Sequence, residues 1–73
     1  MNLKTIWTLK FNDLIINEGD TIKIYLHNDE ILIGDYNFSD ESTIYLNREN
    51  SEMEIDFDDV KEIVILRRWY TNE

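Results

Sequence analysis

Apolar and polar residues alternate through the centre of the chain, and this alternation predicts a β-sheet. Ile22, Ile24 and Leu26 occupy every second position between residues 21 and 27. Successive side chains of a strand point to opposite faces, so the pattern is typical of a strand with one buried face. Further apolar runs between short polar segments predict five strands in all, at residues 21–27, 30–39, 43–48, 52–57 and 62–67.

Gly34 interrupts the second and longest of these predicted strands. A glycine inside a strand usually marks a bend or a bulge. We therefore expect Gly34 to be the bend at which the sheet curls over to close a small five-stranded barrel. Asp58, Asp59 and Val60 predict a single helical turn between the last two strands.

The segment before residue 17 fits two different elements. Its apolar residues recur at three- and four-residue spacing, which predicts a helix over residues 3–15 that packs on the sheet. Trp7, Leu9 and Phe11 also alternate, and β-branched and aromatic residues favour a strand. We favour the helix because the apolar run 14–16 extends the helical stripe and breaks the alternation.

Size and composition predict a single mainly-β domain that spans residues 1–73. The 42% of hydrophobic residues are enough for a folded core. The chain contains no cysteine, so we expect neither disulfides nor thiolate metal sites. It has no apolar run of membrane-spanning length and no signal-peptide pattern, which favours a cytoplasmic protein that binds no membrane.

Acidic residues dominate the centre of the chain. The formal net charge is −9, and residues 11–60 hold fourteen acids and two bases, which gives this part −12. A surface of this kind repels phosphate backbones, so we do not expect direct binding to nucleic acid. The expected partner is a protein with a basic surface.

Two groups of residues are candidates for contact with that partner. The first is a run of carboxylates in and after the fourth predicted strand, Glu52, Glu54, Asp56, Asp58 and Asp59. The simpler interpretation of this run is a solvated outer strand face, and a Mg²⁺ or Ca²⁺ site is a third one that we do not favour. The second group is the basic and aromatic tail Arg68, Trp69 and Tyr70, since these residue types are frequent at binding hot spots.

No constellation of residues in the sequence predicts an enzyme, a cofactor or a metal site. His27 is the only histidine, and no serine has an evident base beside it. Tyr25, Tyr36 and Tyr45 fall on strands, where they could line one outer surface as a stacking platform. We favour cross-strand packing for these three tyrosines.

The predicted order of five short strands, with the glycine in the second strand and the turn before the last, resembles that of the SH3-like barrels. Among these barrels, it resembles the Sm-like proteins. Residues 11–66 are covered by the resemblance, which is carried by the alternating strand, Gly34, an aromatic near Phe38 and Asp40. It implies a short N-terminal helix followed by five strongly bent strands. Thr43 stands near the position where RNA-binding members carry asparagine, and no basic-glycine pair follows Ile63. The resemblance therefore implies the fold rather than RNA binding.

The function that we favour is a non-enzymatic binding or regulatory module. Some small acidic Sm-like proteins block a nucleic-acid-handling protein, and this chain is similar in layout and charge to the inhibitor of the termination factor Rho. The acidic residues would then stand in for phosphates. The first alternative is an Sm-like RNA-binding oligomer. The second alternative is a structural or assembly subunit of a phage or mobile element. Frequent Ile, Asn, Asp and Glu without proline suit a bacterial or phage source.

Overall fold

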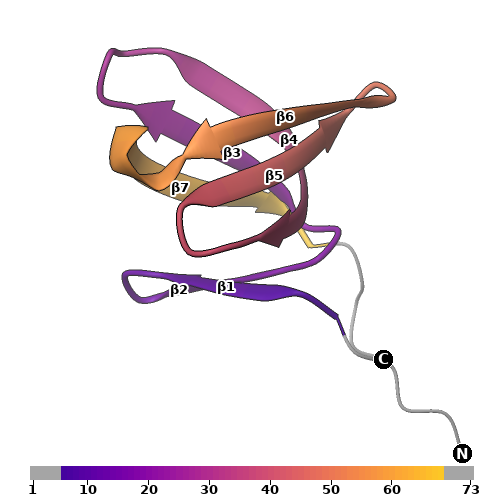
Figure 1. Cartoon of the computed structure of the whole chain (residues 1–73). Helices are drawn as coiled ribbons and strands as arrows, with labels where there is room; N and C mark the ends of the chain where they lie inside the picture. The colour runs from indigo at the N-terminus through magenta and orange to yellow at the C-terminus, as the bar shows by residue number, and fades with distance from the viewer. Residues whose placement is uncertain (1–5, 69–73) are drawn as a thin grey trace, which may run out of the picture.

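A computed structural model describes residues 6–68 of the chain, which form a small mainly-β fold with two antiparallel sheets (Figure 1). The smaller sheet is a hairpin of β1 (Thr8–Phe11) and β2 (Leu14–Asn17). The larger sheet has five strands in the order β6-β5-β4-β3-β7. These strands are β3 (Thr21–Leu26), β4 (Ile31–Ser39), β5 (Thr43–Arg48), β6 (Ser51–Asp56) and β7 (Val60–Arg67), and a 3-10 turn, η1 (Phe57–Asp59), joins the last two.

The five strands of the larger sheet lie within two residues of the ranges that the alternation predicts. The core is formed by apolar residues of all five strands of the larger sheet together with one residue of the small hairpin. Its buried members are Ile16, Ile22, Ile24, Leu26, Tyr36, Ile44, Leu46, Ile55, Val60 and Ile63. The short helical turn is also present, although it begins one residue earlier than predicted. No helix within residues 6–68 has the length and apolar character needed to cross a membrane.

The helix predicted over residues 3–15 is wrong where the structure describes it, and residues 3–5 lie outside the described part. Phe11 pairs directly with Leu14, so Asn12 and Asp13 alone form a tight turn between β1 and β2. Asn12 has a positive φ of 55°, which asparagine tolerates well. Two-residue turns of this kind favour a hairpin over a continuous helix.

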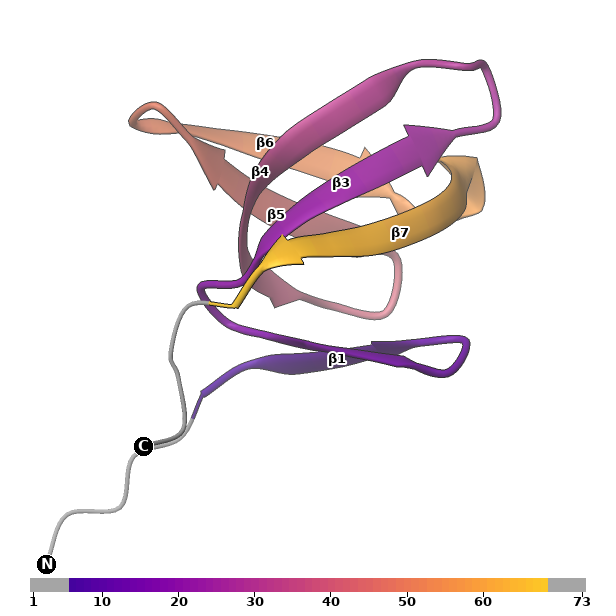
Figure 2. The same ribbon diagram turned by 180° about the vertical axis from the view of Figure 1, so that it is seen from behind.

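The predicted closed barrel is also wrong, because β6 and β7 are the two edges of the larger sheet and do not pair with each other. β7 pairs only with β3 along its length (Figure 2). The hairpin instead lies against one side of the larger sheet in both views and covers its core. Ile16 is fully buried there, and Leu9, Phe11 and Leu14 pack against the core. The apolar interior is therefore completed without closure of the sheet.

Gly34 lies where two strands approach closely, just before β4 exchanges one partner for another. Asp35 pairs with both β3 and β5, whereas earlier residues of β4 pair with β3 and later ones with β5. A Cβ atom on Gly34 would lie 3.1 Å from the Asn47 carbonyl oxygen and 3.2 Å from the Leu46 Cβ. The break in register falls later, between Tyr36 and Phe38. Gly34 therefore permits close packing, and the bulge lies beyond it.

Candidate functional site

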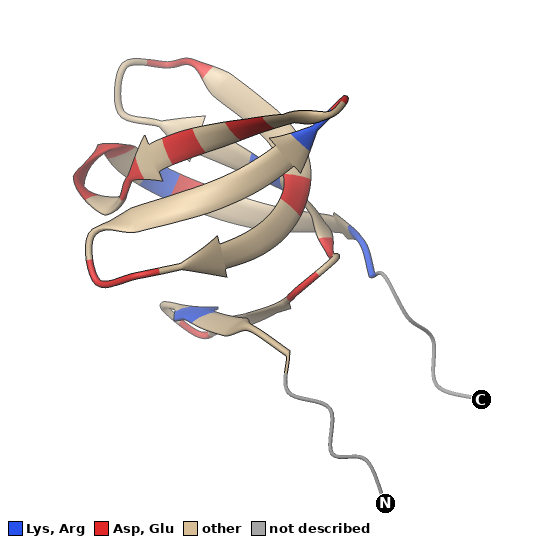
Figure 3. Cartoon of the chain, turned by 45° about the vertical axis from the view of Figure 1, so that its right-hand side comes forward, with Lys and Arg blue, Asp and Glu red and all other residues tan. Residues whose placement is uncertain are grey.

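Three carboxylates, Glu52, Glu54 and Asp56, form an acidic row along the edge strand β6. Ile55 is buried and Met53 is half-buried, whereas all three acidic residues are exposed. Because successive side chains alternate between faces, the three carboxylates lie together on the outer face of the sheet. Acidic segments are visible along β6 in Figure 3.

Little in the described part of the protein offsets this negative charge. The Asn37 side-chain amide donates a hydrogen bond to Glu52 Oε2 at 3.1 Å, and Asp56 Oδ1 accepts one from the Asp58 backbone N–H at 2.9 Å. The Glu54 carboxylate has no hydrogen-bonding partner among residues 6–68. No lysine or arginine nitrogen in that range lies within ion-pair distance of the three carboxylates. The acidic row is thus free to attract cations from outside.

Asp58 and Asp59 extend the acidic surface beyond the end of β6. Both are exposed in η1, whose first turn is capped by Asp56. The Asp59 carbonyl oxygen accepts a hydrogen bond from the backbone N–H of His27, the single histidine, which is exposed in the turn after β3. The structure therefore places all five predicted acidic residues along β6 and the turn that follows it.

Three aromatic side chains, Trp7, Phe38 and Tyr45, form an aromatic cluster beside the acidic row. The rings of Phe38 and Tyr45 stack with centroids 4.3 Å apart, and Trp7 tilts against Phe38 at 5.5 Å. Tyr45 is also the cross-strand neighbour of Glu54. Aromatic rings and carboxylates consequently share one outer face of β4, β5 and β6. Trp7 remains 53% exposed.

The β4–β5 turn adds a further carboxylate to the edge of this cluster. Asp40 Oδ1 accepts hydrogen bonds from the Ser42 and Thr43 backbone N–H groups at 2.9 and 2.8 Å, and these bonds hold the pKa of Asp40 below its usual value. Asp40 Oδ2 accepts a longer bond, 3.4 Å, from the Tyr45 hydroxyl. Partial burial and the nearby Asp40 and Glu54 carboxylates raise the pKa of Tyr45. Near neutral pH, Asp40 is therefore ionised and Tyr45 remains protonated.

The sequence did not reveal this cluster, because it depends on the bulge in β4. Simple alternation places Tyr36 and Phe38 on the same face, but the register shift between them separates the two. Tyr36 is buried and pairs with Leu46 across the strands. The Tyr36 hydroxyl lies 2.8 Å from Ser39 Oγ, and burial raises the pKa of Tyr36. Phe38 instead pairs with Tyr45 on the outer face. The three tyrosines considered from the sequence therefore do not line one surface.

The predicted basic and aromatic tail is only partly described. Arg68 Nη1 lies 2.9 Å from Asp20 Oδ2, in an ion pair that leaves the arginine side chain 46% exposed and the aspartate fully buried. Asp20 Oδ2 also accepts the Asn17 backbone N–H at 2.8 Å. Arg68 follows β7, at the sheet edge opposite β6, and is not brought to the acidic row. Trp69 and Tyr70 lie outside the described residues.

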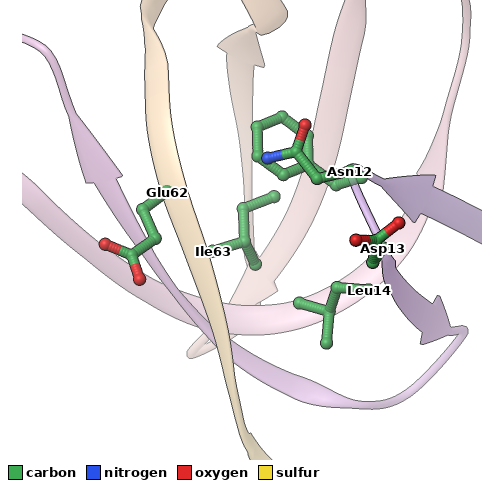
Figure 4. A pocket seen from close by; sticks show the side chains of 6 residues that line it. Asn12, Asp13, Leu14, Glu62 and Ile63 are labelled. Atoms are coloured by element: carbon green, nitrogen blue, oxygen red, sulfur yellow. The ribbon is translucent and has the colours of Figure 1, made fainter.

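An open depression of about 360 Å³ lies between the hairpin turn and β7 (Figure 4). Leu14 and Ile63 contribute apolar side chains to it, and the Asp13 and Glu62 side chains flank them on either side. Within residues 6–68, no group of three or more acidic or histidine side chains is arranged to hold a metal ion. The depression offers a shallow apolar contact with negative charge at its margins.

Of these features, only the outer face of β4, β5 and β6 brings exposed carboxylates and aromatic rings together among the described residues. Its carboxylates can attract a cation, and its rings can stack on a flat or apolar group. Comparisons of this chain with models of protein families, with curated proteins and with solved structures found no match. The function must therefore be inferred from this surface itself.

Proposed function

We propose that this chain is a non-enzymatic binding module that docks a basic surface of another protein onto the acidic row. The observation that carries the proposal is the exposed set of carboxylates on the outer face of an edge strand, none of which forms an ion pair within residues 6–68. The row is held in place by β5, which pairs with all six residues of β6. A rigid line of negative charge steers basic partners and selects against acidic ones.

An inhibitory role follows from the same surface chemistry. Alternate residues of a strand are about 6.6 Å apart, so the row presents regularly spaced negative charges, as a nucleic-acid backbone does. A protein that binds phosphates through lysine and arginine side chains would accept such a row in their place. The likeness in size and charge to small acidic inhibitors of nucleic-acid-handling proteins supports this role.

Binding of a labelled basic peptide, measured by fluorescence anisotropy at about 0.15 M salt, tests the proposal. We expect a triple variant, Glu52→Gln, Glu54→Gln and Asp56→Asn, to weaken binding about tenfold, since each exposed charge pair contributes about 0.5 kcal/mol. Asparagine still caps η1 at position 56, so the fold should be retained.

A matched control shows whether binding depends on where the removed negative charges lie or only on how many are removed. Asp29, Glu30 and Glu62 are exposed on another part of the surface, and their replacement by the matching amides changes the net charge equally. We expect this control to weaken binding much less than the row variant. Equal effects of the two triple variants would contradict a specific docking surface, as would tighter binding to a short RNA than to the peptide.

Self-assembly is the second candidate, and the two free edges of the larger sheet favour it. An unpaired edge strand can pair with another chain. Here β6 and β7 both have one unpaired side among the described strands. Light scattering that shows oligomers at low micromolar concentration, without any basic partner, would support an assembly subunit over a binding module.

A further inference from the structure

We propose that the aromatic cluster makes the docking surface selective for arginine, whose guanidinium group stacks on the exposed rings and donates hydrogen bonds to the carboxylates beside them. This inference rests on the proposed function, because it assumes a basic partner. It adds the identity of the side chain that the surface recognises. The occupant is an arginine-bearing segment of another protein.

Trp7 and Tyr45 are the two rings of the cluster that such a group could contact. Phe38 contacts both of the other rings, because Tyr45 stacks on it and Trp7 tilts against it. Tyr45 stacks on Phe38 with one face, and Glu54 is its cross-strand neighbour on β6. Trp7 has more than half of its surface exposed. A planar cation can therefore lie against the exposed indole ring of Trp7 or approach Tyr45 beside Glu54.

Carboxylates flank the cluster on several sides, and none of them belongs to an ion pair among residues 6–68. Glu54 lies across from Tyr45 on β6, and Asp40 accepts the Tyr45 hydroxyl hydrogen bond. Glu18 exchanges two hydrogen bonds with the Trp7 backbone: its Oε1 accepts the Trp7 N–H at 3.1 Å and its N–H donates to the Trp7 oxygen at 2.8 Å. This charge is complementary to a cation that stacks on the rings.

No cation of the described chain occupies the cluster. The cation–ring contact found within residues 6–68 places Lys23 Nζ 5.5 Å from the centre of the Tyr25 ring. Both of these residues belong to β3, which is separated from β5 by β4 in the sheet order. Within residues 6–68, the protein thus places a lysine on one outer tyrosine and leaves the aromatic cluster open to a cation from a partner.

Arginine fits this combination better than lysine does. The guanidinium is planar, weakly hydrated and able to donate two parallel hydrogen bonds to one carboxylate while it stacks on a ring. The lysine ammonium is a compact and strongly hydrated charge. The acidic row attracts it as strongly as it attracts a guanidinium, but the aromatic rings add less to its binding. A cation–π contribution of the size found at exposed sites corresponds to a preference of about two- to fivefold for arginine.

Two peptides of equal length and charge, one with arginines and one with lysines at the same positions, test the inference by fluorescence anisotropy. We expect the unaltered protein to bind the arginine peptide about two- to fivefold more tightly. Trp7→Leu and Tyr45→Thr should each reduce or remove that preference by weakening arginine binding, and leave lysine binding nearly unchanged. Tyr45→Phe keeps the ring and should keep the preference.

Tyr25→Thr is the matched control, because it removes an outer aromatic ring that lies away from the cluster. We expect it to preserve the preference for arginine. Circular dichroism spectroscopy is the check that each variant folds. If one cluster variant does not fold, the other still gives the answer, because Trp7 lies outside the strands.

Failure of this inference can be told apart from failure of the proposed function. Equal affinity of the unaltered protein for both peptides, or a preference that survives both Trp7→Leu and Tyr45→Thr, would overturn arginine selectivity and leave a basic docking surface in place. Absence of binding to either peptide would overturn both. Binding of single-stranded RNA in preference to either peptide would also overturn both, since the rings would then stack on bases.

Discussion

Gly34→Ala should destabilise the protein, even though alanine is usually the better residue in a strand. The new Cβ would lie 3.1 Å from the Asn47 carbonyl oxygen and 3.2 Å from the Leu46 Cβ, and neither atom is at the end of a flexible side chain. Overpacking of this kind costs about 1–3 kcal/mol. Alanine also lowers the entropy of the unfolded chain, which stabilises the fold by about 0.4–1 kcal/mol. We therefore expect the free energy of unfolding to fall by about 1–2 kcal/mol in total.

Thermal unfolding followed by circular dichroism measures this loss as a fall in Tm of about 4–16 °C for a domain of this size. Gly34→Val, with two more methyl groups in the same space, should lower Tm further. Glu54→Gln is a surface control that should change the free energy of unfolding by less than about 0.5 kcal/mol. A Gly34→Ala variant with the same Tm as the unaltered protein, or a higher one, would refute the close approach of β4 and β5.

Three further changes probe individual contacts. Arg68→Ala removes a partner of the buried Asp20 carboxylate and should cost about 1–3 kcal/mol, less than for a fully buried pair because Arg68 is half-exposed; urea denaturation that shows no loss would contradict this. Asp56→Ala removes the cap of η1 and should cost about 0.5–2 kcal/mol, whereas Asp56→Asn should cost less. Asp40 has a lowered folded-state pKa, so its contribution to stability is present above the unfolded pKa of about 3.9 and is lost as the pH falls through the lower folded value. An NMR titration of the Asp40 carboxyl that gives an ordinary pKa would contradict the hydrogen bonds from its turn.

Much of the larger sheet could be predicted from alternation alone, because one face of each strand is buried. Ile22, Ile24 and Leu26 are all buried in β3, as their spacing requires. The N-terminal segment was misjudged because the run Leu14–Asn17 continues a helical spacing, and the pairing of β1 with β2 overrides it. Closure of the sheet could not be judged from periodicity, which says nothing about which strands form the edges.

The two parts of the candidate surface differed in how far they could be predicted. The acidic row follows from strict alternation in β6, so Glu52, Glu54 and Asp56 could be placed on one outer face from the sequence. The aromatic cluster requires the bulge after Tyr36, which turns Phe38 to the outer face, and no residue type marks that bulge. Bulges depend on how two strands pair and not on the composition of one strand.

Chemical-shift mapping by NMR tests most directly whether a basic partner docks on the outer face of β4, β5 and β6. During titration with the arginine peptide at about 0.15 M salt, we expect the largest shifts at the backbone amides of Glu52, Glu54 and Tyr45 and at the Trp7 indole N–H. Shifts that cluster instead at the depression beside Ile63, or no shifts at a large excess of peptide, would contradict the account.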